Sequence, residues 1–326
     1  VHVGKRRWVL KALKQEMTAH GTIHERHWDG VLTPGLINAH THLQYSGMVQ
    51  VGQGTYDRFR AWELAFNEVY AEAQKTQPWE QWAEDGARQM VESGTTAAAD
   101  IVTDLDAAGA LASQGMHGIA YWEVMGWHNA EWMEKGRTEL IRQLRRMNEE
   151  QLPNLGISPH APYTLESEPF VDLPDIARQL NMRLHIHLAE TPLEAGTYPP
   201  VLTTYSAADW SDHDWESYRQ LQEVGKGASA IQFVDQLGSL GPDVRADGED
   251  RRILRQRGVG VALCPRSNRI TNTGKDAPVR EYLEEGNLVS VGTDSLSSTP
   301  TLDLLDDVSM LYDLAREQGY ASDDLT

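Results

Sequence analysis

Short apolar runs alternate with stretches of helical periodicity along most of this chain of 326 residues. A run of about four to eight apolar residues is typical of a buried strand, whereas apolar residues at every third or fourth position are typical of an amphipathic helix. Strands that alternate with helices form parallel βαβ units, because parallel strands need a crossover between them. The pattern therefore predicts an α/β fold with a parallel sheet.

The apolar runs predict seven strands, at residues 36–39, 95–101, 118–124, 154–158, 182–188, 258–264 and 288–292. Helices are predicted at residues 56–73, 79–92, 105–113, 131–149, 173–180, 213–224, 228–239, 247–257, 279–285 and 302–318. This spacing suits an eight-stranded (β/α) barrel of the TIM type, in which chemistry lies at the C-terminal ends of the strands. An open doubly wound sheet is the alternative, but no glycine-rich phosphate loop follows the first strand.

All predicted strands lie within residues 31–326, which we interpret as a single barrel domain. Residues 1–30 are polar and irregular, and they are predicted to be a separate N-terminal segment. The composition is 40% hydrophobic, which is enough for a substantial core.

The net charge of −19 argues against nucleic acid or an anionic membrane as a partner, because both repel an acidic protein. A single cysteine, Cys264, excludes a disulfide framework and fits a reducing cytoplasm. No apolar run approaches the length of roughly 18 residues that a membrane span needs. The expected partner is a small-molecule substrate, and a homodimer is compatible with the sequence.

Two histidines, His40 and His42, follow the apolar run of the first predicted strand. Residues two apart on a strand share one face, so that both imidazoles face one cavity. Other predicted strands end at His187 and at Asp294. Three imidazoles and one carboxylate form a standard Zn²⁺ ligand set, and a catalytic site leaves one position open for water. Fe²⁺ is the alternative metal, because it takes the same ligands.

Glu190 follows His187 by three residues, at the point where the strand gives way to its loop. From there its carboxylate reaches the water without binding the metal, as expected of a general base that later becomes a general acid. His185 shares a strand face with His187 but lies one layer deeper, and it is predicted to be a hydrogen-bonded core histidine.

Several stretches together resemble the amidohydrolase superfamily, from about residue 30 to the end of the chain. These are Pro34-Gly-Leu-Ile-Asn-Ala-His-Thr-His42, Ser158-Pro-His-Ala-Pro-Tyr163, His187-Leu-Ala-Glu190, Ala262-Leu-Cys-Pro-Arg-Ser-Asn268 and Gly292-Thr-Asp-Ser295. Within that superfamily they resemble the deaminase and chlorohydrolase branch. The resemblance implies one divalent metal on His40, His42, His187 and Asp294. It also implies proton transfer by Glu190 and Asp294, and substrate contact by His160.

More narrowly, the Cys-Pro-Arg-Ser-Asn and Gly-Thr-Asp-Ser-Leu stretches resemble the aminodeoxyfutalosine deaminases of menaquinone biosynthesis. Their substrate is an adenine nucleoside that carries a benzoate, and Arg266 is the predicted partner of that carboxylate. An internal salt bridge of Arg266 is the equally weighted alternative. Trp62 and Glu68, from the first long loop and helix, are further predicted substrate contacts.

The sequence departs from this resemblance in two places. The family carries a sixth strand, with a histidine, between the helices that end near Leu240 and begin near Asp247. Here the intervening stretch is too short and holds no histidine, which indicates residues missing between Val244 and Arg245. The family's small β-sandwich is represented at most by residues 1–30.

The predicted function is hydrolytic deamination of an aminopurine nucleoside, with release of ammonia. Other adenosine-type deaminases, including those for methylthioadenosine or S-adenosylhomocysteine, and triazine or pyrimidine hydrolases are alternatives on the same scaffold, because loops set the substrate range. A non-catalytic metal-binding or ligand-binding barrel is the alternative from a different class, and only the absent histidine favours it.

Overall fold

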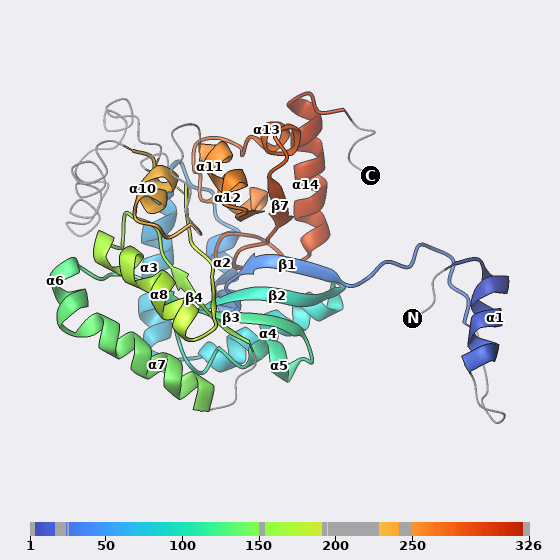
Figure 1. The fold of residues 1–326 in the computed structure, drawn as a ribbon, viewed down its shortest axis with the longest axis horizontal. Helices are drawn as coiled ribbons and strands as arrows, with labels where there is room; N and C mark the ends of the chain where they lie inside the picture. The colour runs from blue at the N-terminus through green and yellow to red at the C-terminus, as the bar shows by residue number, and fades with distance from the viewer. Residues whose placement is uncertain are drawn as a thin grey trace. The chain divides into compact units, whose positions relative to one another are not determined.

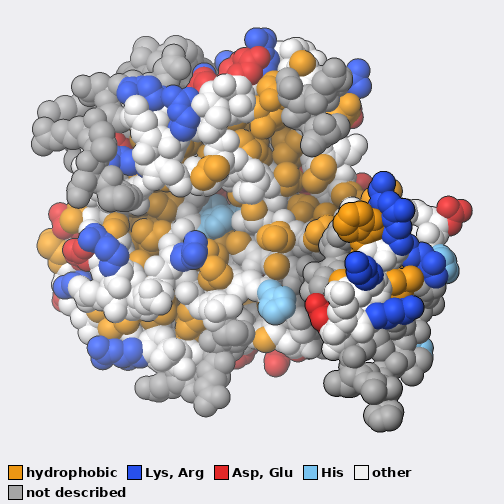
Figure 2. All heavy atoms as spheres, turned by 45° about the vertical axis from the view of Figure 1, so that its right-hand side comes forward, with side chains coloured by type: hydrophobic (Ala, Val, Ile, Leu, Met, Phe, Trp, Pro, Cys, Tyr) orange, Lys and Arg blue, Asp and Glu red, His pale blue; other side chains and the backbone are white. Residues whose placement is uncertain are grey.

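The computed structural model describes residues 4–16, 24, 26–149, 154–190, 194, 228–240 and 250–321. The chain divides into two compact units, Val1–Pro34 and Gly35–Thr326. In the first unit, the described residues form one helix, α1 (Arg6–Glu16), and no strand. Basic side chains gather on this helix, from Arg6, Arg7, Lys11 and Lys14, although the chain as a whole is acidic (Figure 2).

The second unit is built on parallel strands (Figure 1). The first five lie side by side in chain order: β1 (Leu36–Thr41), β2 (Thr95–Val102), β3 (His117–Val124), β4 (Leu155–Pro159) and β5 (Arg183–Leu184). Beyond its two paired residues, the β5 segment continues alongside β4, because the amides of His185 and His187 donate to the carbonyls of Ile157 and Pro159. The predicted strand at 182–188 is thus present, with a short regular part.

The last two strands, β6 (Gly260–Leu263) and β7 (Leu288–Val291), form a second parallel pair. The end of β7 adjoins the end of β1, because the amide of Asp294 donates to the carbonyl of His40 at 3.0 Å. In the described part of the chain, the seven predicted strands are all found, in an arc running β6, β7, β1 and on to β5. This is the α/β fold with parallel strands that the sequence predicts. The predicted gap between Val244 and Arg245 lies outside the described residues.

Helices connect the strands and cover their outer side (Figure 1). They are η1 (Leu43–Met48), α2 (Val49–Gly52), α3 (Phe59–Thr76), α4 (Trp79–Glu92), α5 (Ala110–Ser113), α6 (Asn129–Glu131), η2 (Trp132–Gly136), α7 (Arg137–Glu149), α8 (Ser167–Gln179), α10 (Ala230–Gln236), α11 (Asp250–Gln256), α12 (Pro265–Ile270), α13 (Val279–Glu284) and α14 (Leu304–Glu317). Three of these, η1, α2 and α12, were not predicted, because helices this short carry too few residues to show periodicity. The predicted helix at 213–224 lies outside the described residues.

The core follows from the amphipathic pattern of these helices. Helix α4 buries Ala83, Ala87 and Met90 and packs against η1, β2 and α5. It ends at Ser93-Gly94, where Gly94 adopts φ 91°, a conformation that glycine takes without the steric cost of a Cβ. Around β6 and β7, a second cluster joins residues of α13 and α14: Leu263, Val279, Leu311, Leu314 and Ala315. None of the described helices is long and apolar enough to cross a membrane.

Candidate metal centre

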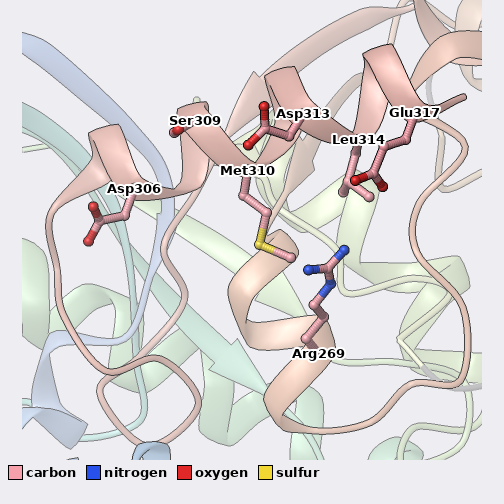
Figure 3. Close-up of a pocket in the computed structure, with 7 residues that line it drawn as sticks. All are labelled: Arg269, Asp306, Ser309, Met310, Asp313, Leu314 and Glu317. Carbon is pink, nitrogen blue, oxygen red and sulfur yellow. The ribbon is translucent and has the colours of Figure 1, made fainter. Parts of the chain in front are cut away.

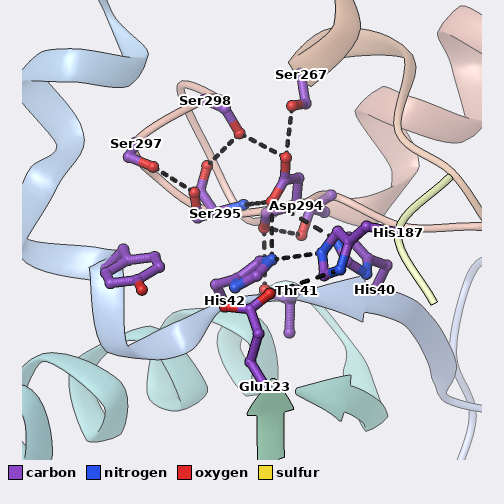
Figure 4. A network of polar contacts seen from close by, with 12 residues as sticks. His40, Thr41, His42, Glu123, His187, Ser267, Asp294, Ser295, Ser297 and Ser298 are labelled. Carbon is purple, nitrogen blue, oxygen red and sulfur yellow. Dashed lines mark hydrogen bonds and ion pairs between the residues drawn. The ribbon is translucent and has the colours of Figure 1, made fainter. Parts of the chain in front are cut away.

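Four side chains predicted as metal ligands meet at one end of the sheet (Figure 4). His40 and His42 come from the end of β1 and are only 8% and 9% exposed. His187 follows β5, and Asp294 follows β7. Because all four positions lie at the C-terminal ends of parallel strands, residues distant in sequence are brought together at one edge.

The ligand atoms converge. Nε2 of His42 lies 3.3 Å from Nε2 of His187, and the Nε2 atoms of His40 and His42 lie 3.8 and 3.7 Å from Oδ1 of Asp294. The three imidazoles satisfy the geometry of a metal-binding group, with ligand atoms within 4.8 Å of one another. Nitrogen lone pairs that face one another repel, and a cation between them removes that repulsion. Three imidazoles and a carboxylate therefore fit a divalent metal by donor type and by position.

Further contacts fix the orientation of these ligands. His185 Nε2 lies 3.0 Å from Nδ1 of His40, which directs the Nε2 of His40 toward the cluster. The prediction that His185 is a hydrogen-bonded core histidine is confirmed. Oδ2 of Asp294 accepts hydrogen bonds from the hydroxyls of Ser267 and Ser298, at 2.7 and 2.9 Å. Such outer partners set the direction of a ligand's lone pair.

The backbone at Asp294 adopts φ 60°, a left-handed conformation that few residues other than glycine take. Hydrogen bonds hold it there: its amide donates to the carbonyl of His40, and the hydroxyl of Thr41 donates to its carbonyl at 3.0 Å. Strain of this kind persists only where the surroundings over-determine it, and it is found at functional sites.

The site keeps its histidines neutral and its aspartate ionised. Burial lowers the pKa of His42 to about 3 and that of His160 to about 4, and it places the pKa of His187 well below its ordinary value. Burial alone would raise the pKa of Asp294, but the adjacent imidazoles and the two serine hydroxyls bring it below its ordinary value. Neutral imidazole and ionised carboxylate are the protonation states that bind metals.

Glu190 lies beside this cluster and is held in place. The hydroxyl of Tyr163 donates to Oε2 of Glu190 at 2.5 Å. The backbone amide of Glu190 donates to the carboxylate of Glu194 at 2.8 Å. Burial raises the pKa of Glu190 to about 8, and the nearby carboxylates of Glu194 and Asp294 add to this effect. A carboxyl group with a pKa near neutrality is suited to both accepting and donating a proton.

His160, predicted as a substrate contact, also lies at the cluster. Its Nδ1 lies 2.6 Å from the hydroxyl of Thr164, and its ring stacks on that of His187 with centroids 4.9 Å apart. With Nδ1 engaged, Nε2 is the atom of His160 available to a ligand.

Arg266 does not reach the cluster. Its guanidinium donates to the buried carboxylate of Asp307 from Nε and Nη2, at 2.9 and 2.7 Å, and to Asp306 and Thr301 from Nη1. Its side chain is 11% exposed. The structure therefore shows the internal salt bridge, the alternative that the sequence left open, and this network leaves no face of the guanidinium for a substrate carboxylate.

The other two predicted substrate contacts lie on α3. The indole of Trp62 donates to the carbonyl of Ser297 at 2.8 Å and packs between Phe59 and Phe66, so that it joins α3 to the loop after β7. Glu68 is exposed on α3, and in the described part of the chain no polar contact connects it with the cluster.

Two further residues at the site were not predicted. Glu123, at the end of β3, lies with Oε1 3.6 Å from Nδ1 of His187. Tyr163 holds Glu190, as described above. A charged residue in an otherwise apolar strand was the available signal for Glu123, and Tyr163 closes a stretch that was singled out for His160 alone.

A separate hollow of about 280 Å³ lies between α12 and α14 (Figure 3). None of its lining residues belongs to the cluster; they are Arg269, Asp306, Ser309, Met310, Asp313, Leu314 and Glu317.

The sequence was compared with those of known protein families. Residues 31–197 and 219–325 match the amidohydrolase family. The chain belongs to the amidohydrolase family. The cluster of candidate metal ligands thus lies in a chain of the amidohydrolase family.

Individual relatives point in the same direction. The 5′-deoxyadenosine deaminase of Methanosarcina mazei is 31% identical over 300 residues, which are 85% of this chain and 60% of that protein. The amidohydrolase chain described here spans about three fifths of the length of the curated relatives it matches.

Two solved structures share the fold. An adenosine deaminase from Xanthomonas campestris with bound zinc has a TM-score of 0.65 at 22% identity, and the match covers 90% of this chain and 63% of that one. Helicobacter pylori aminofutalosine deaminase in complex with methylthio-coformycin has a TM-score of 0.64 at 20% identity, over 90% and 70% of the two chains.

Proposed function

We propose that this amidohydrolase is a hydrolytic deaminase that acts on an adenine nucleoside. The observation that carries the proposal is the pairing of two features: a four-ligand cluster, and beside it a half-buried carboxyl group, Glu190, that is not one of the four. A barrel that only held a metal would have no use for a proton carrier whose pKa lies near neutrality. The relatives that the chain matches include deaminases of adenine nucleosides.

The residues that would hold the metal are His40, His42, His187 and Asp294. A divalent cation bound there supplies Lewis-acid activation of water, and Zn²⁺ is the proposed ion. The described ligands are three nitrogens and one oxygen, a set that zinc favours and that iron also accepts.

The chain's own groups account for the proton transfers. Water adds to the ring carbon that carries the amine, and Glu190 accepts one of its protons and delivers it to the adjacent ring nitrogen. Asp294, ionised in this site, accepts the second proton and passes it to the leaving amine. The carbon–nitrogen bond then breaks, ammonia leaves, and the ring keeps the oxygen of water as a carbonyl.

Tyr163 and His160 complete the proposed roles. Tyr163 holds the Glu190 carboxylate by its 2.5 Å hydrogen bond, so that the proton carrier keeps its direction during the two transfers. His160 offers Nε2 to the substrate ring, because Thr164 engages its Nδ1. Orienting groups of this kind act by reducing the freedom that must be lost in the transition state.

The substrate is proposed at two levels. The broader proposal is a 5′-modified adenosine. The finer proposal is aminodeoxyfutalosine, with a role in menaquinone biosynthesis; it now depends on motif resemblance alone, because Arg266 is occupied by Asp307. We therefore expect no special preference for a substrate that carries a carboxylate through this arginine.

A nucleoside panel tests the proposal. The zinc-loaded protein is incubated with 5′-deoxyadenosine, methylthioadenosine, S-adenosylhomocysteine, aminodeoxyfutalosine and adenosine, and conversion of the amine to the carbonyl is followed by ultraviolet absorbance. Turnover of at least one, abolished by Glu190→Gln, is the expected result. If no nucleoside reacts while a chlorotriazine or an aminopyrimidine does, the nucleoside proposal is wrong.

A further inference from the structure

Glu123 is a buried residue with a carboxylate oxygen that accepts no hydrogen bond from the described residues. It is the penultimate residue of β3, and its side chain is only 4% exposed. Its Oε1 atom is buried, and within the described part of the chain no hydrogen bond reaches it. A buried carboxylate oxygen without a donor costs free energy, so that such an atom marks either strain or an interaction that forms in the working state.

A ring nitrogen of a candidate metal ligand lies close to this oxygen. Oε1 of Glu123 lies 3.6 Å from Nδ1 of His187, and Figure 4 shows the carboxylate beneath the cluster, with a contact running to that imidazole. The opposite nitrogen of the same ring, Nε2, faces His42 at 3.3 Å. The two nitrogens of His187 therefore point to two different partners, the ligand cluster and Glu123.

The position of the ring proton of His187 follows from the chemistry of imidazole. A neutral ring that gives its Nε2 lone pair to a cation carries its proton on Nδ1. That N–H needs an acceptor in a buried site. The described acceptors near it are Oε1 of Glu123, at 3.6 Å, and the hydroxyl of Ser158, at 3.5 Å. A carboxylate is the stronger acceptor, because a charge-assisted hydrogen bond is roughly twice as strong as a neutral one.

We propose that Glu123 is a positioning residue of the metal centre: its carboxylate accepts the Nδ1–H of His187 and so directs Nε2 of that ligand to the cation. The inference rests on the metal site of the proposed function. His40 has the corresponding support from His185, whose Nε2 lies 3.0 Å from its Nδ1. Two of the three imidazole ligands are thus oriented from behind by a side chain of another strand: His40 by His185 of the β5 segment, and His187 by Glu123 of β3.

A second cation is the competing interpretation, because Glu123, His160 and His187 also lie close enough to bind one. One feature argues against it. His187 would have to bind a cation through each of its two ring nitrogens, and this requires loss of the N–H proton that the neutral ring still carries. A single cation with an oriented ligand satisfies the same atoms without an imidazolate.

Zinc affinity tests the proposal without any substrate. The apoprotein is titrated with Zn²⁺ against a chromophoric chelator, for wild type, Glu123→Ala, Glu123→Gln and Asp100→Asn. Removal of a partner behind a ligand lowers metal affinity by about 10- to 100-fold, and this loss is expected for Glu123→Ala. Glu123→Gln keeps a neutral acceptor at the same place, so that it should lose less.

Asp100 is the matched control. Its carboxyl is equally buried, at 1% exposed, near the end of the adjacent strand β2, but it accepts from the amide of Leu43 and is not part of the cluster. Asp100→Asn is expected to bind zinc as wild type does, whatever it does to stability. The visible spectrum of the Co²⁺-loaded proteins is a second readout, and it should change for Glu123→Ala and stay unchanged for Asp100→Asn.

The outcomes distinguish a failure of the positioning role of Glu123 from a failure of the proposed function. Wild-type affinity in Glu123→Ala, or two zinc ions per wild-type chain with one lost in Glu123→Gln, would overturn the positioning role and leave the proposed function standing. A wild-type protein that binds no zinc would instead overturn the metal site, and the proposed function with it.

Discussion

Removal of one hydroxyl, in Tyr163→Phe, is expected to move the pH dependence of the reaction. Tyr163 donates to Oε2 of Glu190 at 2.5 Å, and this hydrogen bond stabilises the ionised carboxylate. Burial raises the pKa of Glu190 to about 8 even with the bond in place. A hydrogen bond to a charged group contributes about 1.5–3 kcal/mol. At about 1.4 kcal/mol per pH unit, its loss raises the pKa of Glu190 by roughly one to two units.

The assay is the pH profile of kcat/KM for whichever nucleoside the protein turns over, since this ratio reports the ionisations of the free enzyme. Because Glu190 acts first as a base, it must be ionised, and the acid limb of the Tyr163→Phe profile should shift to higher pH. Below the limb the rate should fall about ten- to a hundredfold, and above it the rate should approach that of wild type. Tyr56→Phe is the control, because it removes a similar hydroxyl bond, to the carbonyl of Val51, away from Glu190. An acid limb at the wild-type position in Tyr163→Phe would refute the role of this bond.

Three further predictions concern stability and packing. In Gly292→Ala, the new Cβ would lie 2.8 Å from the Cβ of His40 and 2.9 Å from Sγ of Cys264. We therefore expect a loss of about 1–3 kcal/mol in the free energy of unfolding, together with weaker zinc binding. Unchanged values in urea unfolding and in zinc titration would contradict this. Arg266→Ala leaves the fully buried carboxylate of Asp307 without its cation, and should lower the free energy of unfolding by about 3–5 kcal/mol. It should lower activity equally on nucleosides with and without a carboxylate. A selective loss of activity on the carboxylate-bearing nucleoside would restore the substrate role of Arg266. For the metal-free protein in chelator, burial lowers the pKa values of His42, His160 and His185 from 6.5 to about 3 or 4, which makes stability rise with pH up to about 6.5. Burial raises the pKa values of Glu123 and Glu190 from 4.5 to about 8, which lowers stability between about pH 4.5 and 8. Since the histidines of the site outnumber these two carboxyls, stability should be highest near pH 6.5 and fall toward pH 8. Melting temperatures that rise without a maximum across this range would show that the carboxyls are not buried in their neutral form.

The strands and the ligands they carry were predictable from the sequence for a physical reason. A parallel strand buried on both faces is a short apolar run, and the polar residue that ends it stands out against that run. His40, His42 and Asp294 were found in this way, and the parallel arrangement alone brings their side chains to one edge. The α/β fold followed from the same alternation of strands and helices.

What lies around the ligands was less predictable, because it depends on distances between strands. Glu123 and His187 are 64 residues apart in the sequence, and they meet only because β3 and the β5 segment flank β4. Arg266 shows the opposite case. Its sequence context suggested a substrate carboxylate, but the folded chain supplies internal carboxylates from α14, and a guanidinium in a buried network prefers partners that are already fixed.

Metal content per chain tests the central claim, that four side chains from three distant parts of the sequence form one metal site. Wild type and Asp294→Ala are purified, stripped with chelator, reloaded with Zn²⁺, dialysed and analysed by elemental mass spectrometry. Wild type should hold one zinc ion per chain and Asp294→Ala a small fraction of one, with both proteins folded by circular dichroism. A folded wild type without metal, or an Asp294→Ala variant that retains the full amount, would contradict the claim.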